Sequence, residues 1–146
     1  MRELTARVEN TIHASPSEVW VALTTPATLK KFFFGAEIST DWVVGSAIRM
    51  TGAYQGKSYE DKGKILVIEP QQRLSFSHWS AMSGKPDVPE NYHVVTFELT
   101  PDGAQTRVAL SQTNLYGGVT QADIAHRAEY EKNWAMVLDG LAKLFA

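Results

Sequence analysis

The chain has 146 residues, of which 44% are hydrophobic and 21% charged, ordinary values for one soluble globular domain. Its net charge of −2 gives no basic surface for nucleic acid or an anionic membrane, and the absence of cysteine excludes disulfides and thiol chemistry. No apolar run reaches the length of a membrane span, and the first residues show no signal-peptide pattern. We therefore expect a cytoplasmic protein that forms a single domain over residues 1–146.

The first part of the chain predicts a strand followed by two short helices. Residues 2–13 alternate between apolar and polar positions, as a half-buried strand does. Ser15-Pro16-Ser17-Glu18 has the order of an N-cap, a first-turn proline and a capping-box glutamate. Thr25-Pro26 repeats the signal of N-cap and proline, and Gly35 is the predicted C-cap. Three consecutive aromatic residues precede Gly35, and at least one of Phe32–Phe34 should lie at the surface or at a cavity mouth.

From Glu37 to Asn114 the sequence has the signals of antiparallel strands. Strands are expected over residues 47–51, 64–68, 74–79, 93–99 and 106–114. Turn residues separate most of them, at Gln55-Gly56, Glu69–Gln72 and Pro101–Gly103, and a longer loop is expected over residues 81–90. Helices before and after such a run predict an α+β fold.

The turn near residue 102 suggests a strand register. If that turn is tight, the expected pairs are Phe97 with Val108, Val95 with Leu110 and His93 with Gln112. A matching register across the longer loop would place His78 beside His93. The inward face then changes from apolar rows to a polar row formed by His78, His93 and Gln112.

Residues 120–146 predict one long helix. Thr120 is the expected N-cap, with Asp123 three residues later. Apolar side chains then recur at steps of three and four residues on one face: Tyr130, Trp134, Val137, Leu138, Leu141 and Phe145. The second half of this face is purely apolar, whereas Arg127 and Glu131 interrupt or flank the first half. One end of the helix should therefore pack a core, and the other end should line something polar.

Several segments together resemble a known family. They are Val19–Pro26 with Leu29 and Phe32-Phe33, Gly63–Pro70 with Arg73–Phe76, Val95–Pro101 with Thr106–Val108, and Trp134, Leu138 and Leu141. In this order they resemble the AHSA1-like proteins, relatives of the C-terminal domain of the activator of the Hsp90 ATPase, within the START-like or SRPBCC superfamily. The resemblance implies a helix-grip fold, in which a curved antiparallel sheet wraps around the C-terminal helix with a hydrophobic cavity between them.

Two positions depart from the family pattern, and both fall where the cavity is expected. The last helix of the family often carries His-x-x-Gly-Trp, where this chain has Tyr130–Trp134. The central hairpin often ends in tryptophan, where this chain has His78. The ligand of a relative is therefore not carried over to this chain.

These patterns predict a site for a small hydrophobic or amphipathic molecule. The start of the long helix should bring Arg127, Tyr130 and Glu131 to the polar row of the sheet, so that distant polar groups converge at one end of an apolar cavity. The expected ligand-binding residues are Phe33, Met50, Phe76, His78, His93, Val95, Leu110, Gln112, Arg127, Tyr130, Glu131 and Trp134.

Other functions stay open. A cyclase-like or hydratase-like enzyme would use the same cavity, with His78, His93 or Tyr130 as proton carriers. The resemblance also suggests a protein-interaction module or an Hsp90-type chaperone co-regulator, which ranks third. Exposed strand edges and Trp42 are compatible with a homodimer. In the alternative interpretation without a binding site, His78 and His93 are structural residues and Arg127 pairs with Glu131. The four histidines lack metal-ligand spacing, and the sequence has no phosphate-loop or dinucleotide-binding motif, so no metal or other cofactor is expected.

Overall fold

The computed structural model describes residues 4–146, except for the side chains of Tyr54 and Met82. The first residues of the strand expected over 2–13 therefore lie outside the described part. The elements in chain order are β1 (Ala6–Ile12), α1 (Pro16–Leu23), α2 (Pro26–Phe32), β2 (Glu37–Thr40), β3 (Ala47–Tyr54), β4 (Lys57–Glu69), β5 (Arg73–His78), η1 (Ala81–Ser83), η2 (Pro89–Asn91), β6 (His93–Asp102), β7 (Gln105–Asn114) and α3 (Gln121–Lys143).

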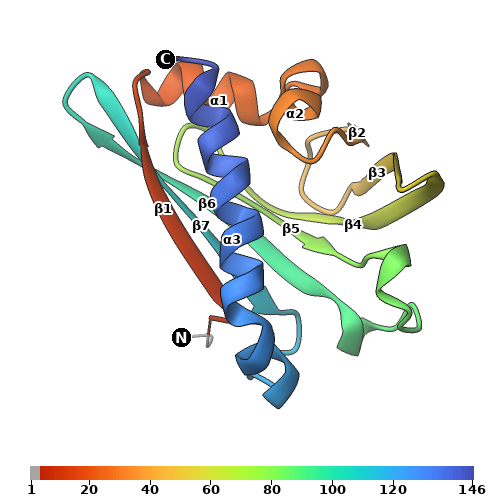
Figure 1. The fold of residues 1–146 in the computed structure, drawn as a ribbon. Helices are drawn as coiled ribbons and strands as arrows, with labels where there is room; N and C mark the ends of the chain where they lie inside the picture. Colours follow the sequence, from red (N-terminus) through yellow and green to blue (C-terminus); the bar gives the residue numbers. More distant parts are fainter. Residues whose placement is uncertain (1–3) are drawn as a thin grey trace.

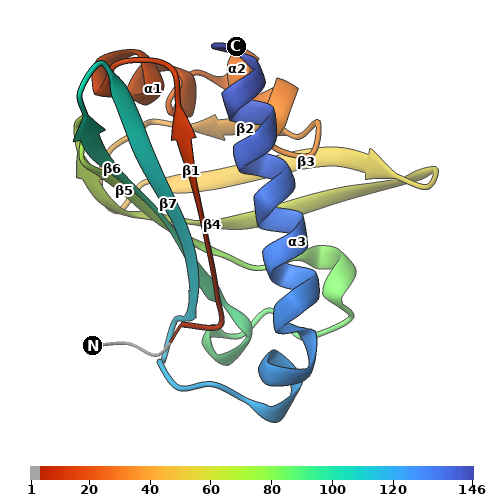
Figure 2. The same cartoon turned by 60° about the vertical axis from the view of Figure 1, so that its left-hand side comes forward.

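The described strands form one seven-stranded antiparallel sheet in the order β1-β7-β6-β5-β4-β3-β2. The sheet curves, and α3 lies across one of its faces (Figures 1 and 2). Helices α1 and α2 lie beside the C-terminal end of α3 (Figure 1). This confirms the predicted α+β helix-grip architecture. No helix in residues 4–146 combines the length and apolar character needed to cross a membrane.

Two helices begin with the capping boxes that the sequence predicts. At α1, the Ser15 hydroxyl accepts a hydrogen bond from the Glu18 N–H, and the Glu18 carboxylate accepts one from the Ser15 N–H. At α3, Thr120 and Asp123 make the same exchange, at 3.0 and 2.9 Å. Each exchange satisfies two backbone donors that a helix start otherwise leaves without partners.

Helix α2 starts where the sequence predicts, with Thr25 in the N-cap position and Pro26 as the first helical residue, but the cap has no side-chain bond and the helix ends early. The Thr25 hydroxyl does not cap α2, because it donates backwards to the Val21 carbonyl oxygen of α1, at 2.6 Å. The helix ends at Phe32, three residues before Gly35, because Phe34 and Gly35 take φ values of 55° and 69°. Phe34 is consequently 51% exposed, as expected for one member of the aromatic triplet.

The predicted register of β6 against β7 is wrong by two residues. Phe97 pairs with Leu110, Val95 with Gln112 and His93 with Asn114. The strands continue to Asp102 and Gln105 around a two-residue turn, so the hairpin is longer and tighter than the Pro101–Gly103 signal suggested. The pairing of His78 with His93 is confirmed.

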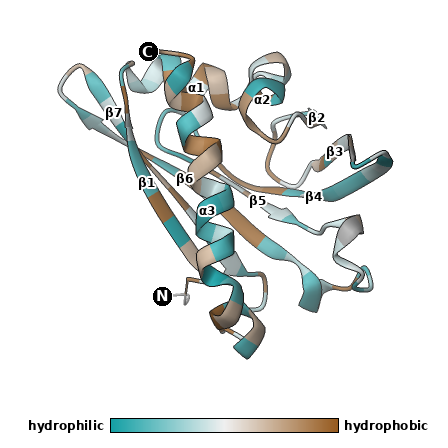
Figure 3. Cartoon of the chain, viewed as in Figure 1, coloured by the Kyte–Doolittle hydropathy of each residue, from teal (hydrophilic) through white to brown (hydrophobic). Residues whose placement is uncertain are grey.

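The β2–β4 region contains more strand than the sequence indicated. Strand β2 was not predicted as a strand of its own, and β4 begins at Lys57 rather than at Lys64. The β3–β4 hairpin turns at Gln55-Gly56, where both residues have positive φ, as that dipeptide predicts. Its outer part is coloured mostly as hydrophilic in Figure 3, which explains why apolar periodicity did not reveal it.

The core lies between the C-terminal half of α3, helices α1 and α2, and the central strands. Val137, Leu138 and Leu141 are at most 1% exposed. Gly140 lets α3 approach α2, because a Cβ atom at this position would lie 2.8 Å from Cβ of Phe32. This end of the helix is the one that the sequence predicts to pack a core, and that prediction is confirmed.

Candidate functional site

A cavity of about 340 Å³ opens between the sheet and the middle of α3. Its size lies within the range typical of small-molecule sites. Its lining consists of Phe33, Phe34, Ala36, Met50, Tyr59, Asp61, His78, Ser80, His93, Gln112, Tyr130, Asn133 and Trp134. These residues come from the α2–β2 segment, the β3–β4 hairpin, three central strands and α3. A larger open groove, of about 510 Å³, lies elsewhere, between the β4–β5 turn and the end of β6.

A chain of side-chain hydrogen bonds crosses the floor of the cavity. The Trp134 indole N–H donates to Oε1 of Gln112, at 2.9 Å. Nε2 of Gln112 lies 3.3 Å from Nδ1 of His93, and that nitrogen also lies 3.2 Å from Oδ1 of Asn114. The amide of Asn114 donates in turn to the Asp123 carboxylate, at 2.8 Å. This series of hydrogen bonds therefore runs from α3 to β7, across to β6, back to β7 and on to the start of α3.

Burial of this network shifts two pKa values. Burial lowers the pKa of His93 below its ordinary value of 6.5, and the nearby His78 lowers it further, so the ring is neutral at neutral pH. For Asp123, burial alone would raise the pKa. Hydrogen bonds from the Thr120 backbone, the Asn114 amide and the Thr120 hydroxyl outweigh burial and hold its pKa below the ordinary value. The buried carboxylate is therefore charged, and it fixes Asn114.

A second polar pair lies on the hairpin side. Nε2 of His78 lies 3.0 Å from Oδ2 of Asp61, and the other oxygen of Asp61 accepts the Ala81 N–H, at 3.1 Å. When its ring is neutral, His78 carries its proton on Nε2 to make this bond, so Nδ1 is the basic nitrogen. Burial and the charge of Asp61 raise the pKa of Tyr59, which keeps this hydroxyl protonated.

Aromatic rings form another part of the cavity lining. The Phe33 and Phe34 rings meet edge to face, with centroids 5.4 Å apart, and both lie within 6.0 Å of the Trp134 ring. The Tyr130 ring approaches His93, at 6.4 Å. Burial, followed by the charges of Asp123 and Glu129, raises the pKa of Tyr130. The cavity lining thus combines a cluster of aromatic rings with a set of hydrogen-bonding groups.

Seven of the twelve predicted site residues line the cavity: Phe33, Met50, His78, His93, Gln112, Tyr130 and Trp134. Phe76, Val95 and Leu110 do not, because they belong to the packed core, where each is at most 4% exposed. Only about 10 Å³ of space remains between Phe33, Phe76 and their apolar neighbours. The expected cavity is therefore confined to its polar end, and the apolar rows are filled with side chains.

Arg127 and Glu131 also lie outside the cavity, on the side of α3 that covers β1. Arg127 donates to the carbonyl oxygens of Leu4 and Thr5, at 3.0 and 3.1 Å. The Glu131 carboxylate accepts the Arg7 N–H, at 3.0 Å. Since β1 is the last of the described strands in the sheet, these side chains satisfy a backbone edge that no other described strand pairs with. They bind this edge instead of the polar row, which corrects the prediction.

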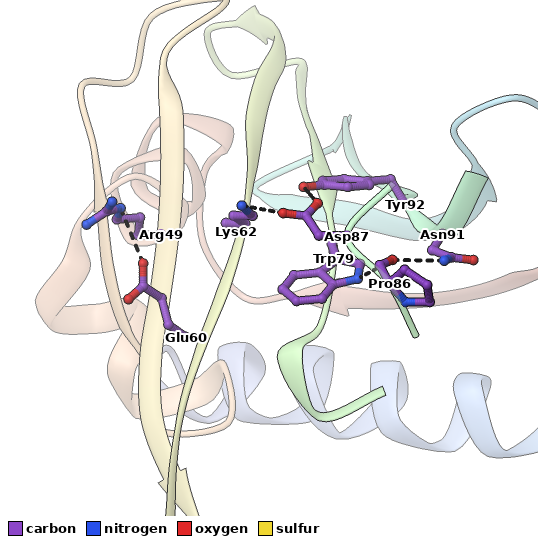
Figure 4. Close-up of polar contacts among 8 residues, drawn as sticks. All are labelled: Arg49, Glu60, Lys62, Trp79, Pro86, Asp87, Asn91 and Tyr92. Carbon is purple, nitrogen blue, oxygen red and sulfur yellow. Dashed lines mark hydrogen bonds and ion pairs between the residues drawn. The ribbon is translucent and has the colours of Figure 1, made fainter. Parts of the chain in front are cut away.

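The segment between β5 and β6 contributes Ser80 to the cavity lining. Figure 4 shows how its outer side is held. The Pro86 carbonyl oxygen accepts the Trp79 indole N–H and the Asn91 amide, while Asp87 pairs with Lys62 and accepts the Tyr92 hydroxyl. Burial, together with the Asp87 carboxylate, raises the pKa of Tyr92 to about 12. The expected long loop is thus tied to β4 by side chains.

The sequence reasoning missed the hairpin contribution to the site. Tyr59 and Asp61 alternate along β4 with the same period that brings Ile65 inward, so a longer predicted strand would have found them. Asn133 follows Tyr130 by one helical turn and precedes Trp134, which was also a readable signal. In the described residues, no group of three His, Asp or Glu side chains is arranged to hold a metal ion.

Comparison with known proteins places the chain in a structural context. The sequence model of the family described as activator of Hsp90 ATPase homolog 1-like protein matches residues 13–146. The solution structure of ChR145 from Cytophaga hutchinsonii is 40% identical, with a TM-score of 0.77, over 99% of this chain and 94% of that one. No curated protein matches the sequence.

Two further solved structures share the fold at lower identity. CalU16 from Micromonospora echinospora is 26% identical, with a TM-score of 0.68, over 96% of this chain and 74% of that one. The Aha1 dimer from Colwellia psychrerythraea is 24% identical, with a TM-score of 0.69, over 96% of this chain and 94% of that one. At 24% identity, the second likeness concerns the fold alone.

Proposed function

We propose that this chain, which belongs to the activator of Hsp90 ATPase homolog 1-like family, binds a small hydrophobic or amphipathic molecule in its cavity. The proposal starts from the cavity because one fold can host several unrelated functions. The observation that carries the proposal is the mixed lining, with aromatic rings from α3 and the end of α2, and with Asp61, His78, His93 and Gln112 from the strands. An apolar body can lie against the rings while a polar group bonds to the strand residues.

Native mass spectrometry of freshly purified protein, compared with the denatured protein, tests this proposal. We expect an additional mass that disappears on denaturation. Asn133→Trp should abolish it, because Asn133 is exposed at the cavity and a bulky ring there fills the space. Lys132→Trp is the matched control, since Lys132 is exposed on α3 but does not line the cavity. Retention of the ligand by Asn133→Trp would reject this site.

An enzyme of the cyclase or hydratase kind is the second candidate, and the His78–Asp61 hydrogen bond favours it. The carboxylate orients the ring and leaves Nδ1 available to accept a proton. The captured molecule would be incubated with wild-type protein and with His78→Ala, and its mass followed over time. A carrier keeps most of its affinity in the variant and leaves the molecule unchanged. An enzyme converts it, and the variant loses turnover.

A role in protein interaction is the third candidate, supported by exposed apolar side chains. Phe34 is 51% exposed, and Val43 and Val44, in the β2–β3 connection, are each 60% exposed. The related Colwellia psychrerythraea protein is described as a dimer. Light scattering would measure the oligomeric state, and a pull-down at moderate salt would measure Hsp90 binding. A monomer with no Hsp90 binding at micromolar concentration would remove this candidate.

A further inference from the structure

His93 stands between two amide groups that make opposite demands on the same nitrogen. Oδ1 of Asn114 lies 3.2 Å from Nδ1 and can only accept a hydrogen bond, whereas Nε2 of Gln112 lies 3.3 Å from Nδ1 and can only donate one. Both amide orientations are fixed elsewhere. Gln112 turns its oxygen to the Trp134 indole N–H, and Asn114 turns its nitrogen to Asp123 and to the Gly118 carbonyl oxygen.

A neutral imidazole cannot satisfy both neighbours at once. With the proton on Nδ1, the ring donates to Asn114, and Nε2 is a hydrogen-bond acceptor. With the proton on Nε2, Nδ1 accepts from Gln112, and Nε2 is a donor. Each tautomer makes one internal hydrogen bond and forgoes one, so the count of bonds favours neither. Burial, which lowers the pKa of His93, keeps the ring in this neutral pair of states.

The nitrogen that changes character is the one left for a ligand. His93 lines the cavity, and among the described residues only its Nδ1 has hydrogen-bond partners. The described lining contains one carboxylate, Asp61, which already bonds to His78, and it includes no lysine or arginine. An anionic ligand would therefore lose hydration without a lysine or arginine of the lining to pair with, since Lys85, whose charge acts on His93, does not line the cavity.

We propose that the cavity takes an uncharged molecule with a hydroxyl or carbonyl group, and that Nε2 of His93 binds this group as acceptor or as donor by changing tautomer. This inference rests on the proposed binding function, whose ligand class it specifies. Molecules that interconvert between enol and keto forms belong to the class, because the same nitrogen can bind both forms. Gln112 and Asn114 act as positioning residues, since they set the balance between the tautomers.

The tautomer balance can be measured without a ligand. Long-range proton–nitrogen NMR correlations of the histidine-labelled full chain report the protonation of both ring nitrogens, and His93→Gln identifies the signals. In the wild type we expect both His93 nitrogens between the protonated and unprotonated positions. Asn114→Ala should move the proton to Nε2, and Gln112→Met should move it to Nδ1. One fixed tautomer in the wild type that neither variant changes would overturn the inference.

The two variants control for each other. Amide spectra show whether each is folded, and because the shifts are expected in opposite directions, a shared loss of structure cannot imitate them. Opposite shifts in folded variants support the role of the two amides. Shifts in the same direction contradict it.

Three naphthalenes of similar size then test the ligand class: 2-naphthol, 2-acetonaphthone and 2-naphthoate. We expect the two neutral probes to bind about tenfold or more tightly than the carboxylate, because the carboxylate has no cationic partner in the cavity. Naphthol should favour the proton on Nδ1 and acetonaphthone the proton on Nε2. Tighter binding of naphthoate, or one tautomer with both neutral probes, overturns the proposal. If no probe binds although the free protein shows both tautomers, the proposed binding function and the recognition by Nε2 fail. The tautomer exchange of His93 set by Gln112 and Asn114 would still stand in that case.

Discussion

The two halves of α3 rest on the same sheet in different ways. In the C-terminal half, Val137, Leu138 and Leu141 are at most 1% exposed, and Gly140 allows close contact with α2. In the N-terminal part, from residue 121 to residue 134, Trp134 reaches the sheet through a hydrogen bond to Gln112, and Arg127 bonds to the backbone just before β1. The C-terminal half is held by packing, and the N-terminal part is held largely by directional contacts that leave a cavity between helix and sheet.

This difference separates stability from binding along a single helix. Apolar contacts need no particular partner, so the C-terminal half fills its space completely and supplies the larger share of buried apolar surface. Polar groups hold fixed geometries only when each has a partner, so the residues of the polar row are placed by their hydrogen bonds and not by filling the space. The cavity therefore lies at the end where the helix gains least from burial, which suits a site that must admit a molecule.

The largest expected effect comes from breaking the packed half. Leu141→Ala should lower the free energy of unfolding by about 2–5 kcal/mol, because it removes a fully buried side chain and leaves a cavity. Urea denaturation measures the change. Met136→Ala, on the exposed side of the same helix at 58% exposure, is the control and should change stability by less than about 0.5 kcal/mol. Equal effects of the two variants would contradict the packed-half description.

A smaller loss is expected from releasing the N-terminal half from β1. Arg127→Met should lower the free energy of unfolding by about 1–2 kcal/mol, because two backbone carbonyl oxygens of residues 4 and 5 lose a charged donor. It should leave the mass of the bound molecule unchanged, since Arg127 does not line the cavity. Loss of the ligand at unchanged stability would instead place Arg127 in the binding site.

The sequence predicts the packed half better than the polar half, for a physical reason. Burial depends on periodicity, and the spacing of Val137, Leu138 and Leu141 fixes their inward face without reference to any other element. The polar half depends on register and on partners. His78 and His93 were placed together correctly, but a two-residue difference in β6–β7 changed the partner of His93 from Gln112 to Asn114.

The side of a helix on which a charged residue acts is harder to predict. Arg127 and Glu131 lie close enough to the apolar face to suggest the cavity, and only the position of β1 as the last strand explains why they turn to its backbone. Tyr59 and Asp61 were missed because their strand is hydrophilic over most of its outer half. In both cases the missing information is the tertiary arrangement, that is, which element packs against α3 and which strand residues face the cavity.

The cap of α3 offers a finer comparison of how its N-terminal half is held. Thr120→Ala should lower the free energy of unfolding by about 1 kcal/mol, because it removes the hydroxyl that accepts the Asp123 N–H. Thr25→Ala should cost less, because the Thr25 hydroxyl does not cap α2. Urea denaturation of both variants would show the order, and an equal or larger loss for Thr25→Ala would contradict it.

The smallest expected effect is the pH dependence contributed by His93. Its folded pKa lies below the ordinary value of 6.5, so between these two values the unfolded chain binds more protons than the folded one. The stability contributed by neutral His93 is therefore complete above about pH 6.5 and is lost as the pH falls towards the folded pKa. The depressed pKa of Asp123 acts in a separate window, because its contribution is present above the ordinary carboxyl value of 3.8 and is lost only at lower pH.

The variant His93→Gln separates the pH dependence contributed by His93 from that of the other three histidines of the chain. Urea denaturation of wild type and variant at several pH values between 8 and 5 should show a wild-type stability that falls more steeply with acid than that of the variant, by less than the loss expected for Thr120→Ala. The same variant leaves the packed half of α3 untouched, so Leu141→Ala should lose equal stability with either residue at position 93. Parallel pH curves for wild type and His93→Gln would mean that the polar end stabilises charged and neutral imidazole equally, and the contrast between the two halves of α3 would then rest on packing alone.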